Sequence, residues 1–202
     1  MAPYNPEEHH RRSLRLPNYD YTQSGAYFVT ICTWNRECLL GEIVAGEMRL
    51  NEYGHIVVEC WLAIPQHFPR VELDAFVVMP NHIHGIIMIA GATHPSPDLV
   101  GATHASPDPV GATHASPLQK QHRSGPKTQS LGAIVGSFKS AAAKRINEFR
   151  GTPGFPVWQR NYYEHIIRNE SALQRIRMYI QNNPINWDLD SENPNRKGQS
   201  RC

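Results

Sequence analysis

An apolar stretch from Val77 to Ile89, VVMPNHIHGIIMI, carries two histidines two residues apart. Side chains at positions i and i+2 of a strand point to the same face, so His82 and His84 would lie together while Ile83 points to the opposite face. Neutral imidazoles placed in this way can bind a divalent metal ion when oxygen ligands complete the set. The alternative is a pair of structural histidines with satisfied hydrogen bonds, and the spacing alone does not decide between the two.

A tyrosine and an asparagine near the C-terminus could complete this chemistry. In the segment RMYIQNNP, Tyr179 and Asn183 are four residues apart, so both would lie on one face of a helix. Asn183 precedes Pro184, which disfavours helical backbone at that position, and Asn182 is therefore an alternative ligand. A phenol that can attack phosphorus, an amide oxygen and two imidazoles together indicate metal-assisted cleavage of a phosphodiester. The expected cofactor is Mg²⁺ or Mn²⁺.

Other residues compete for the same roles. Tyr162 and Tyr163, in NYYEH, are rival nucleophiles, but neighbours on a strand point to opposite faces, so at most one could reach the metal. For His165 we favour a position in the core or near the substrate over a role as a ligand. A histidine-triad nucleotide hydrolase also uses H-x-H, but it needs a third histidine where Ile86 stands. A structural metal-binding domain would need no tyrosine on the facing helix.

The elements that must position these residues follow from apolar periodicity. Segments rich in β-branched and aromatic residues predict strands at 25–34, 47–51, 71–79, 82–89 and 157–168, with 47–51 as the neighbour of 25–34. Helical spacing predicts helices at 52–68, 130–149 and 171–183. Asn51 is the expected N-cap of the first helix, and Ser171 with Gln174 forms a capping box for the last. This order predicts an α+β fold in which helices pack on an antiparallel-rich central sheet, with the histidine strand in its centre.

Three consecutive decapeptides, GATHPSPDLV, GATHASPDPV and GATHASPLQK, interrupt this order at residues 91–120. Each contains Gly and Pro and no aromatic residue, which predicts a flexible insertion between two elements of one domain. The expected organisation is an N-terminal basic arm at 1–24, a single domain at 25–187 and a disordered C-terminal tail at 188–202.

Positive charge is concentrated after the histidine strand. Residues 119–180 contain 11 Lys and Arg against 3 Asp and Glu, whereas residues 1–90 contain 6 against 10. A basic segment favours a polyanionic partner such as nucleic acid, and a solvated helix face is the alternative. The candidates for phosphate contacts and base stacking are Lys139, Lys144, Arg145, Trp158, Arg160, Arg168, Arg175 and Arg177.

The composition gives no indication of secretion or membrane insertion. The four cysteines include no C-x-x-C pair, and the N-terminus lacks an apolar signal core. No apolar run approaches the ~20 residues that a membrane span requires. We therefore expect a soluble, cytoplasmic protein with reduced thiols.

Five segments occur in a defined order along the chain: RRSLRLPNYDYTQSGAYFVTICTWNRECLLGEI, VVMPNHIHGI, SFKSAAAKRIN, VWQRNYYEHIIRNE and YIQNNP. The H-I-H strand, the later tyrosine and the asparagine four residues beyond it resemble the HUH endonucleases, in particular the single-tyrosine transposases similar to the IS200/IS605 type. The five segments together look most like the REP-associated tyrosine transposases, a bacterial branch of that group. The resemblance covers residues 11–187 apart from the decapeptides.

This resemblance implies a metal-dependent endonuclease and strand transferase that acts on single-stranded DNA near hairpin-forming palindromes, through a 5′-phosphotyrosine intermediate. It implies that His82 and His84 bind the metal, that Asn183 is the third ligand and that Tyr179 is the nucleophile. A catalytically inactive, domesticated hairpin-binding protein on the same scaffold is the alternative. The IS200/IS605 group is typically dimeric whereas the REP-associated branch can work as a monomer, so both oligomeric states stay open.

Overall fold

The computed structural model describes residues 19–90, 127–194 and 196. Its centre is a four-stranded antiparallel sheet in the order β4-β5-β1-β6. These strands are β1 (Gly25–Cys32), β4 (Val71–Met79), β5 (His82–Ile89) and β6 (Tyr163–Ile167). The helices are α1 (Glu52–Leu62), α2 (Ile64–His67), α3 (Leu131–Phe149) and α4 (Glu170–Asn182), with two 3-10 helices, η1 (Trp34–Arg36) and η2 (Trp187–Leu189).

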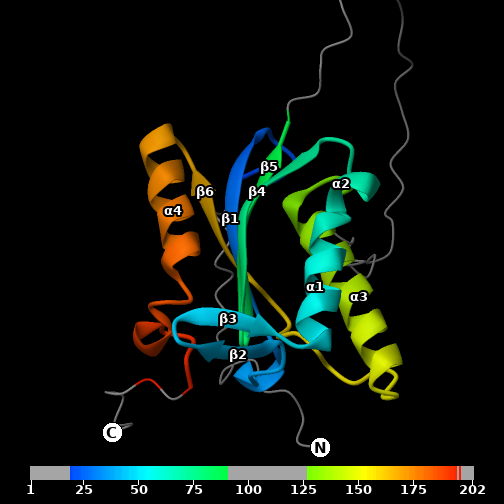
Figure 1. Ribbon diagram of the computed structural model, residues 1–202. Coiled ribbons are helices and arrows are strands. Elements are labelled where there is room, and N and C mark those ends of the chain that lie inside the picture. The colour runs from blue at the N-terminus through cyan, green and yellow to red at the C-terminus, as the bar shows by residue number, and fades with distance from the viewer. Residues whose placement is uncertain (1–18, 91–126, 195, 197–202) are drawn as a thin grey trace, which may run out of the picture.

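The helices form two layers on the sheet. α1, α2 and α3 lie on one face, and α4 lies alone on the other (Figure 1). The histidine strand β5 is central, between β4 and β1. The predicted α+β fold, with an antiparallel sheet and a central histidine strand, is therefore confirmed. Among the described residues, no helix has the length and apolar character needed to cross a membrane.

Alternation along β5 divides its side chains between the two layers. Ile83 and Ile87 are fully buried in the core that β1 and β5 share with α1 and α3. Ile86 faces the other way and packs with Leu173 and Ile180 of α4. His84 and His82 are two and four residues before Ile86, so their side chains lie on the same face of the strand, which is the face covered by α4.

Gly85 allows α1 to approach the histidine strand closely. A Cβ atom at this position would lie 2.3 Å from ring carbon Cζ2 of Trp61. The indole of Trp61 stacks on Phe76 of β4, with ring centroids 4.7 Å apart. The helix layer behind β5 thus fixes the strand from the side opposite its histidines.

The smaller sheet corrects one predicted pairing. The segment predicted at 47–51 forms β3 (Glu47–Leu50), but it pairs with β2 (Gly41–Val44) and not with β1. The prediction was wrong because it missed the hairpin turn between them. Ala45 and Gly46 both have positive φ, of 53° and 81°, and such residues close a tight hairpin whose strands then pair with each other.

Several helix ends also differ from prediction. The segment predicted as one helix at 52–68 is divided into α1 and α2, with Pro65 in the first turn of the second helix. Asn51 caps α1 as predicted and accepts a hydrogen bond from the Gly54 amide at 3.0 Å. The predicted capping box at Ser171 is wrong, because Asn169 caps α4 by accepting a hydrogen bond from the amide of Ala172, the third residue of the helix, at 2.8 Å.

The segment that follows Trp187 packs on the domain. Asp190 and Asn193 are both buried, at 9% and 7% exposure. We expected a disordered tail from residue 188, and residues 188–194 correct this expectation because they form part of the folded domain. The decapeptide insertion at 91–120 lies outside the described residues, as do residues 1–18 of the expected N-terminal arm.

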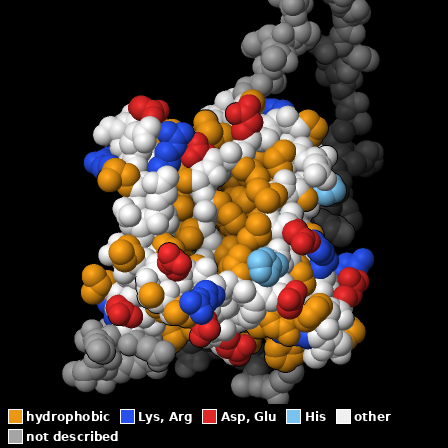
Figure 2. Space-filling view, in the orientation of Figure 1, with side chains coloured by type: hydrophobic (Ala, Val, Ile, Leu, Met, Phe, Trp, Pro, Cys, Tyr) orange, Lys and Arg blue, Asp and Glu red, His pale blue; other side chains and the backbone are white. Residues whose placement is uncertain are grey.

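One edge of the sheet is formed by β4, and the other by β6. Figure 2 shows apolar side chains gathered between α1 and α4, over β4. The pairing register of β4 with β5 shifts between Leu73 and Phe76, and Asp74 in this bulge forms an ion pair with Arg177 of α4 at 2.6 Å. Bulges and charges of this kind interrupt an edge that could otherwise pair with another strand.

Candidate metal and nucleophile site

The two histidines of β5 face each other in the layer between the sheet and α4. His82 Nε2 and His84 Nε2 are 3.0 Å apart. Both side chains are buried, at 0% and 3% exposure. Their outer nitrogens contact polar groups: His82 Nδ1 lies 2.8 Å from Asn81 Oδ1, and His84 Nδ1 lies 2.9 Å from Thr30 Oγ1. Each ring is therefore oriented by a neighbour, as metal-binding imidazoles usually are.

Asn81 fixes the tautomer of His82. Its amide nitrogen donates to the carbonyl oxygens of Arg36 and Glu192, at 3.1 and 2.7 Å, so its oxygen must face the imidazole and accept from Nδ1–H. Nε2 of His82 is then left with a lone pair directed at the centre of the site.

Burial keeps both imidazoles neutral. It lowers the pKa of His82 to about 3, assisted by the positive charge of Arg36. It also lowers the pKa of His84 to about 3, with His82 as a second cause and Asp190 acting in the opposite direction. A neutral imidazole is the form that binds a metal ion, so both rings are in that form near neutral pH.

A buried carboxylate completes the group. Asp190 Oδ2 lies 3.9 Å from His82 Nε2, and its side chain is 4% exposed. One potential ligand atom from each of His82, His84 and Asp190 lies within 4.8 Å of the others. The sequence prediction missed Asp190, because it falls in the expected tail and no local spacing connects it with the histidines.

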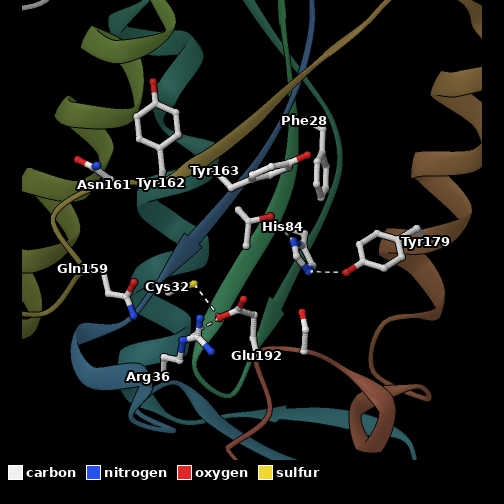
Figure 3. Close-up of a pocket in the computed structure, with 12 residues that line it drawn as sticks. Phe28, Cys32, Arg36, His84, Gln159, Asn161, Tyr162, Tyr163, Tyr179 and Glu192 are labelled. Atoms are coloured by element: carbon white, nitrogen blue, oxygen red, sulfur yellow. Dashed lines mark hydrogen bonds and ion pairs between the residues drawn. The ribbon is translucent and has the colours of Figure 1, made fainter. Parts of the chain in front are cut away.

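The predicted nucleophile lies beside this group. The hydroxyl of Tyr179, on α4, is 3.2 Å from His84 Nε2, and the two rings lie 5.2 Å apart (Figure 3). Burial raises the pKa of Tyr179, as does the negative charge of Asp190, while a hydrogen bond with Asn183 lowers it. The ion pair between α4 and the β4 bulge holds this helix against the sheet.

Asn183 stays on the same helical face as Tyr179. Its φ and ψ of −61° and −43° are helical although Pro184 follows, so the expected departure from helical geometry does not occur. The Asn183 side chain is 3% exposed, and its Oδ1 is buried without a hydrogen-bond partner among the described residues. Asn182, the alternative ligand, is exposed.

The donor atoms present fit a divalent cation. The group offers two neutral imidazole nitrogens and a carboxylate. At the end of α4, four residues beyond Tyr179, the Asn183 amide oxygen is buried without a partner among the described residues, which is costly unless a ligand satisfies it. Mixed oxygen and imidazole sets of this kind suit Mn²⁺ and tolerate Mg²⁺. The buried histidine and aspartate group could therefore bind a metal ion.

A cavity of about 480 Å³ opens next to His84 and Tyr179. Figure 3 shows Tyr163 and Phe28 on one side of it and Arg36 with Glu192 on the other. The residues that line the cavity are Phe28, Thr30, Cys32, Arg36, His84, Gln159, Asn161, Tyr162, Tyr163, Tyr179, Ser191 and Glu192. Because the cavity borders both the tyrosine hydroxyl and a histidine, a substrate in it would reach the reactive groups.

The structure separates the two rival tyrosines. Tyr163 is the register partner of Thr30, which in turn is paired with His84, so Tyr163 lies on the face of the metal group. Tyr162 packs against the core on the other face. His165 lies away from the metal group, beside a separate cavity of about 350 Å³.

The predicted DNA-contacting residues lie in different environments. Those that are exposed without an ion pair among the described residues are Arg160, Arg168 and Arg175. Those that are engaged in ion pairs are Lys144 with Glu148, Arg145 with Glu59, and Arg177 with Asp74. Lys144 and Arg145 are on α3, across the sheet from the metal group.

The two remaining candidates are partly or fully buried. Lys139 Nζ donates to the carbonyl oxygens of Gln159 and Asn161, at 2.6 and 3.2 Å. Trp158 is 7% exposed and packs on Phe138 in the core, so it offers no free ring face to a base. The structure therefore does not gather the basic candidates into one surface around the site.

One solved structure shows that this fold occurs in a known class of proteins. A REP-associated tyrosine transposase bound to a REP hairpin matches with a TM-score of 0.50 and 18% identity, over 93% of this chain and 74% of that one. A candidate transposase of Deinococcus radiodurans matches with a TM-score of 0.43 and 19% identity, over 83% of this chain and 95% of that one. The chain has the fold of the REP-associated tyrosine transposases, which confirms the structural resemblance predicted from the sequence.

Sequence comparison shows a family to which the chain belongs. It is 44% identical over 193 residues to a protein of Haemophilus influenzae described as uncharacterized, and the match covers 93% of this chain and 95% of that protein. The chain belongs to the same family as this Haemophilus protein. No family model matches the chain.

Proposed function

We propose that the protein is a metal-dependent endonuclease and strand transferase for single-stranded DNA, with Tyr179 as its nucleophile. The observation that carries this proposal is the position of the Tyr179 hydroxyl, 3.2 Å from His84 Nε2 at the edge of a buried group of metal-ligand type. A purely structural metal site would not need a half-exposed tyrosine beside it, with an open cavity next to the hydroxyl.

His82, His84 and Asp190 would hold the metal ion, with the Asn183 amide oxygen as a further donor. When bound, a divalent metal ion neutralises and orients the scissile phosphate. Asn81 and Thr30 contact the Nδ1 atoms of the two imidazoles, which leaves the Nε2 atoms facing each other as the ring nitrogens that would hold the ion. This assignment keeps the predicted ligands and adds the carboxylate that the sequence did not reveal.

Tyr179 would carry out the covalent step. Its oxygen forms a bond to phosphorus, the bond from phosphorus to the 3′ oxygen breaks, and the departing strand takes a proton to become a 3′ hydroxyl. The phenol loses its proton in this step, and its raised pKa means that the proton must be removed during attack. Attack by a 3′ hydroxyl on the phosphotyrosine reverses these changes and joins two strands.

The proposed substrate is a DNA hairpin with unpaired flanks. The transposase with the shared fold was solved bound to a REP hairpin. Arg160, Arg168 and Arg175 are exposed on or near β6 and α4, the elements that border the site, and are our candidates for phosphate contacts outside it.

A covalent capture experiment tests the proposal without knowledge of the target sequence. Affinity-tagged protein is incubated with a pool of random single-stranded DNA and Mn²⁺ or Mg²⁺, denatured and recovered, and the attached strands are sequenced. We expect a defined cleavage site beside a palindrome, and a nucleotide on the peptide that contains Tyr179. Tyr179→Phe should abolish capture.

Two results would contradict this proposal. Capture that persists in Tyr179→Phe would assign the nucleophile to another residue. If the wild-type protein enriched hairpins in the pool but never formed a bond that survives denaturation, the inactive hairpin-binding alternative would replace it.

A further inference from the structure

We infer that the cavity beside His84 is a binding site for one unpaired nucleotide, with its base on the ring of Tyr163 and its phosphate at Arg36. This inference rests on the proposed function and adds to it the residues that would bind the strand next to the scissile phosphate. It depends on the placement of one exposed aromatic ring and one arginine at opposite sides of the same cavity.

Tyr163 is placed for stacking. It lies in the same cross-strand row as Thr30 and His84, on the edge strand β6, and its side chain is 46% exposed. Phe28 supports it from the inner side through an edge contact with ring centroids 6.4 Å apart. The ring borders the cavity in Figure 3. An exposed aromatic ring held in this way is a platform on which any base can stack.

Arg36 is held at the opposite side by an unusual backbone. Asn35 and Arg36 both have positive φ, of 52° and 56°, and two consecutive non-glycine residues in this region are strained. The guanidinium pairs with the carboxylate of Glu192 at 3.1 Å, and the side chain of Arg36 is still 49% exposed. The thiol of Cys32 donates to the same carboxylate at 3.4 Å.

The η1 turn is also connected to the metal group. The carbonyl oxygen of Arg36 accepts from the Asn81 amide, whose oxygen orients His82. The strained turn therefore sets the position of Arg36 relative to the proposed metal ligands. A guanidinium in such a place can contact phosphate oxygens through several donors.

The size of the cavity suits one nucleotide. Its volume of about 480 Å³ lies within the range typical of small-molecule sites. A base on Tyr163 and a phosphate at Arg36 would leave the adjoining phosphate near Tyr179, where the proposed reaction takes place.

A binding experiment in a non-cleaving background tests this inference. The Tyr179→Phe protein, without added metal, is titrated with fluorescent oligothymidylate of about 20 nucleotides at several salt concentrations, a length that exceeds the typical site of a single-strand binding domain. A second probe carries one central 5-iododeoxyuridine, which cross-links on irradiation to an aromatic ring stacked on it. Mass spectrometry then identifies the modified peptide.

We expect the cross-link on Tyr163. Tyr163→Leu should weaken binding by roughly 5- to 150-fold, whereas Tyr163→Phe, which keeps the ring, should bind as before. Arg36→Gln should reduce the slope of log affinity against log salt by about 0.7, the value for one phosphate contact on a single strand. Arg49→Gln, an exposed arginine of β3 that does not line the cavity, is the matched control and should leave the slope unchanged.

The outcomes separate this inference from the proposed function. Unchanged affinity in Tyr163→Leu, a cross-link elsewhere, or an unchanged salt slope in Arg36→Gln would overturn the nucleotide site, even if covalent capture by Tyr179 succeeds. If these binding effects occur but capture fails, the nuclease proposal is overturned and the nucleotide site stands. Thermal melting of each variant confirms that it is folded.

Discussion

Replacing Asn81 by alanine should weaken metal binding through a residue that is not itself a ligand. Asn81 is fully buried, and its oxygen accepts from His82 Nδ1–H at 2.8 Å. Without this acceptor, the imidazole loses its orientation and its preferred tautomer. Removal of such a partner typically costs 10- to 100-fold in metal affinity, so we expect Mn²⁺ affinity to fall by roughly that factor.

The same substitution should lower the free energy of unfolding. The Asn81 amide also donates to the carbonyl oxygens of Arg36 and Glu192, so alanine removes three hydrogen bonds, one buried and two partly buried. At about 1 kcal/mol for each, the free energy of unfolding should fall by roughly 2 to 4 kcal/mol. Denaturant unfolding measures this change, and titration calorimetry with Mn²⁺ measures the affinity.

Asn81→Asp separates the two effects. Aspartate keeps an acceptor for His82 Nδ1–H but loses both donated hydrogen bonds, so this variant should be less stable than wild type and still bind Mn²⁺ with at least wild-type affinity. Both proteins are compared at a temperature where each is folded. If Asn81→Ala bound Mn²⁺ as tightly as wild type, the assignment of the Nε2 lone pair of His82 to a metal ion would be refuted.

Three further predictions follow from other parts of the structure. Because the histidines and Tyr179 meet within one chain, a mixture of His82→Ala and Tyr179→Phe proteins should form no covalent DNA adduct, and restored activity in the mixture would show a site shared between two chains. Burial lowers the pKa of Lys139 to about 8 from 10.5, so the unfolded chain binds more protons between these values and the stabilising contribution of this residue should rise with pH across them. The free energy of unfolding is measured against pH for wild type and for Lys139→Met, and the difference between the two curves isolates this effect. A difference that does not change with pH would contradict the prediction. Gly85→Ala places a Cβ 2.3 Å from an indole carbon of Trp61 on α1 and should lower the melting temperature. The control Gly136→Ala, in open space on α3, should raise the melting temperature because alanine has the higher helix propensity. Equal effects of the two substitutions would argue against the close packing behind β5.

Local patterns predicted the strands and helices that carry the histidines and the tyrosine. β4 and β5 coincide with the predicted segments 71–79 and 82–89 because each is an apolar run bounded by turn residues. The i, i+2 spacing of His82 and His84 and the helical position of Tyr179 were sufficient to predict that these side chains face one layer. Periodicity is a property of neighbouring residues, so it serves well for groups within one element.

Local sequence patterns did not predict contacts between segments that are distant in the sequence. Asp190 reaches the histidines only because the chain turns back after η2, and no spacing in the sequence encodes that turn. Arg36 reaches the cavity through two residues of positive φ that are not glycine, so the usual sequence signal for such a turn is missing. Asn183 is helical before a proline because the helix packing overrides the local preference.

The two histidines differ in how firmly their neighbours fix them. Asn81 can only accept from His82, because its amide hydrogens are already donated, so the Nε2 lone pair of His82 always faces inward. The hydroxyl of Thr30 can either donate to His84 Nδ1 or accept from it, so His84 can direct either a hydrogen or a lone pair toward His82 at 3.0 Å. Two lone pairs at that distance repel and need a proton or a cation between them. A fixed His82 beside an adaptable His84 allows the same buried pair to be stable with a shared hydrogen and ready to bind a metal ion.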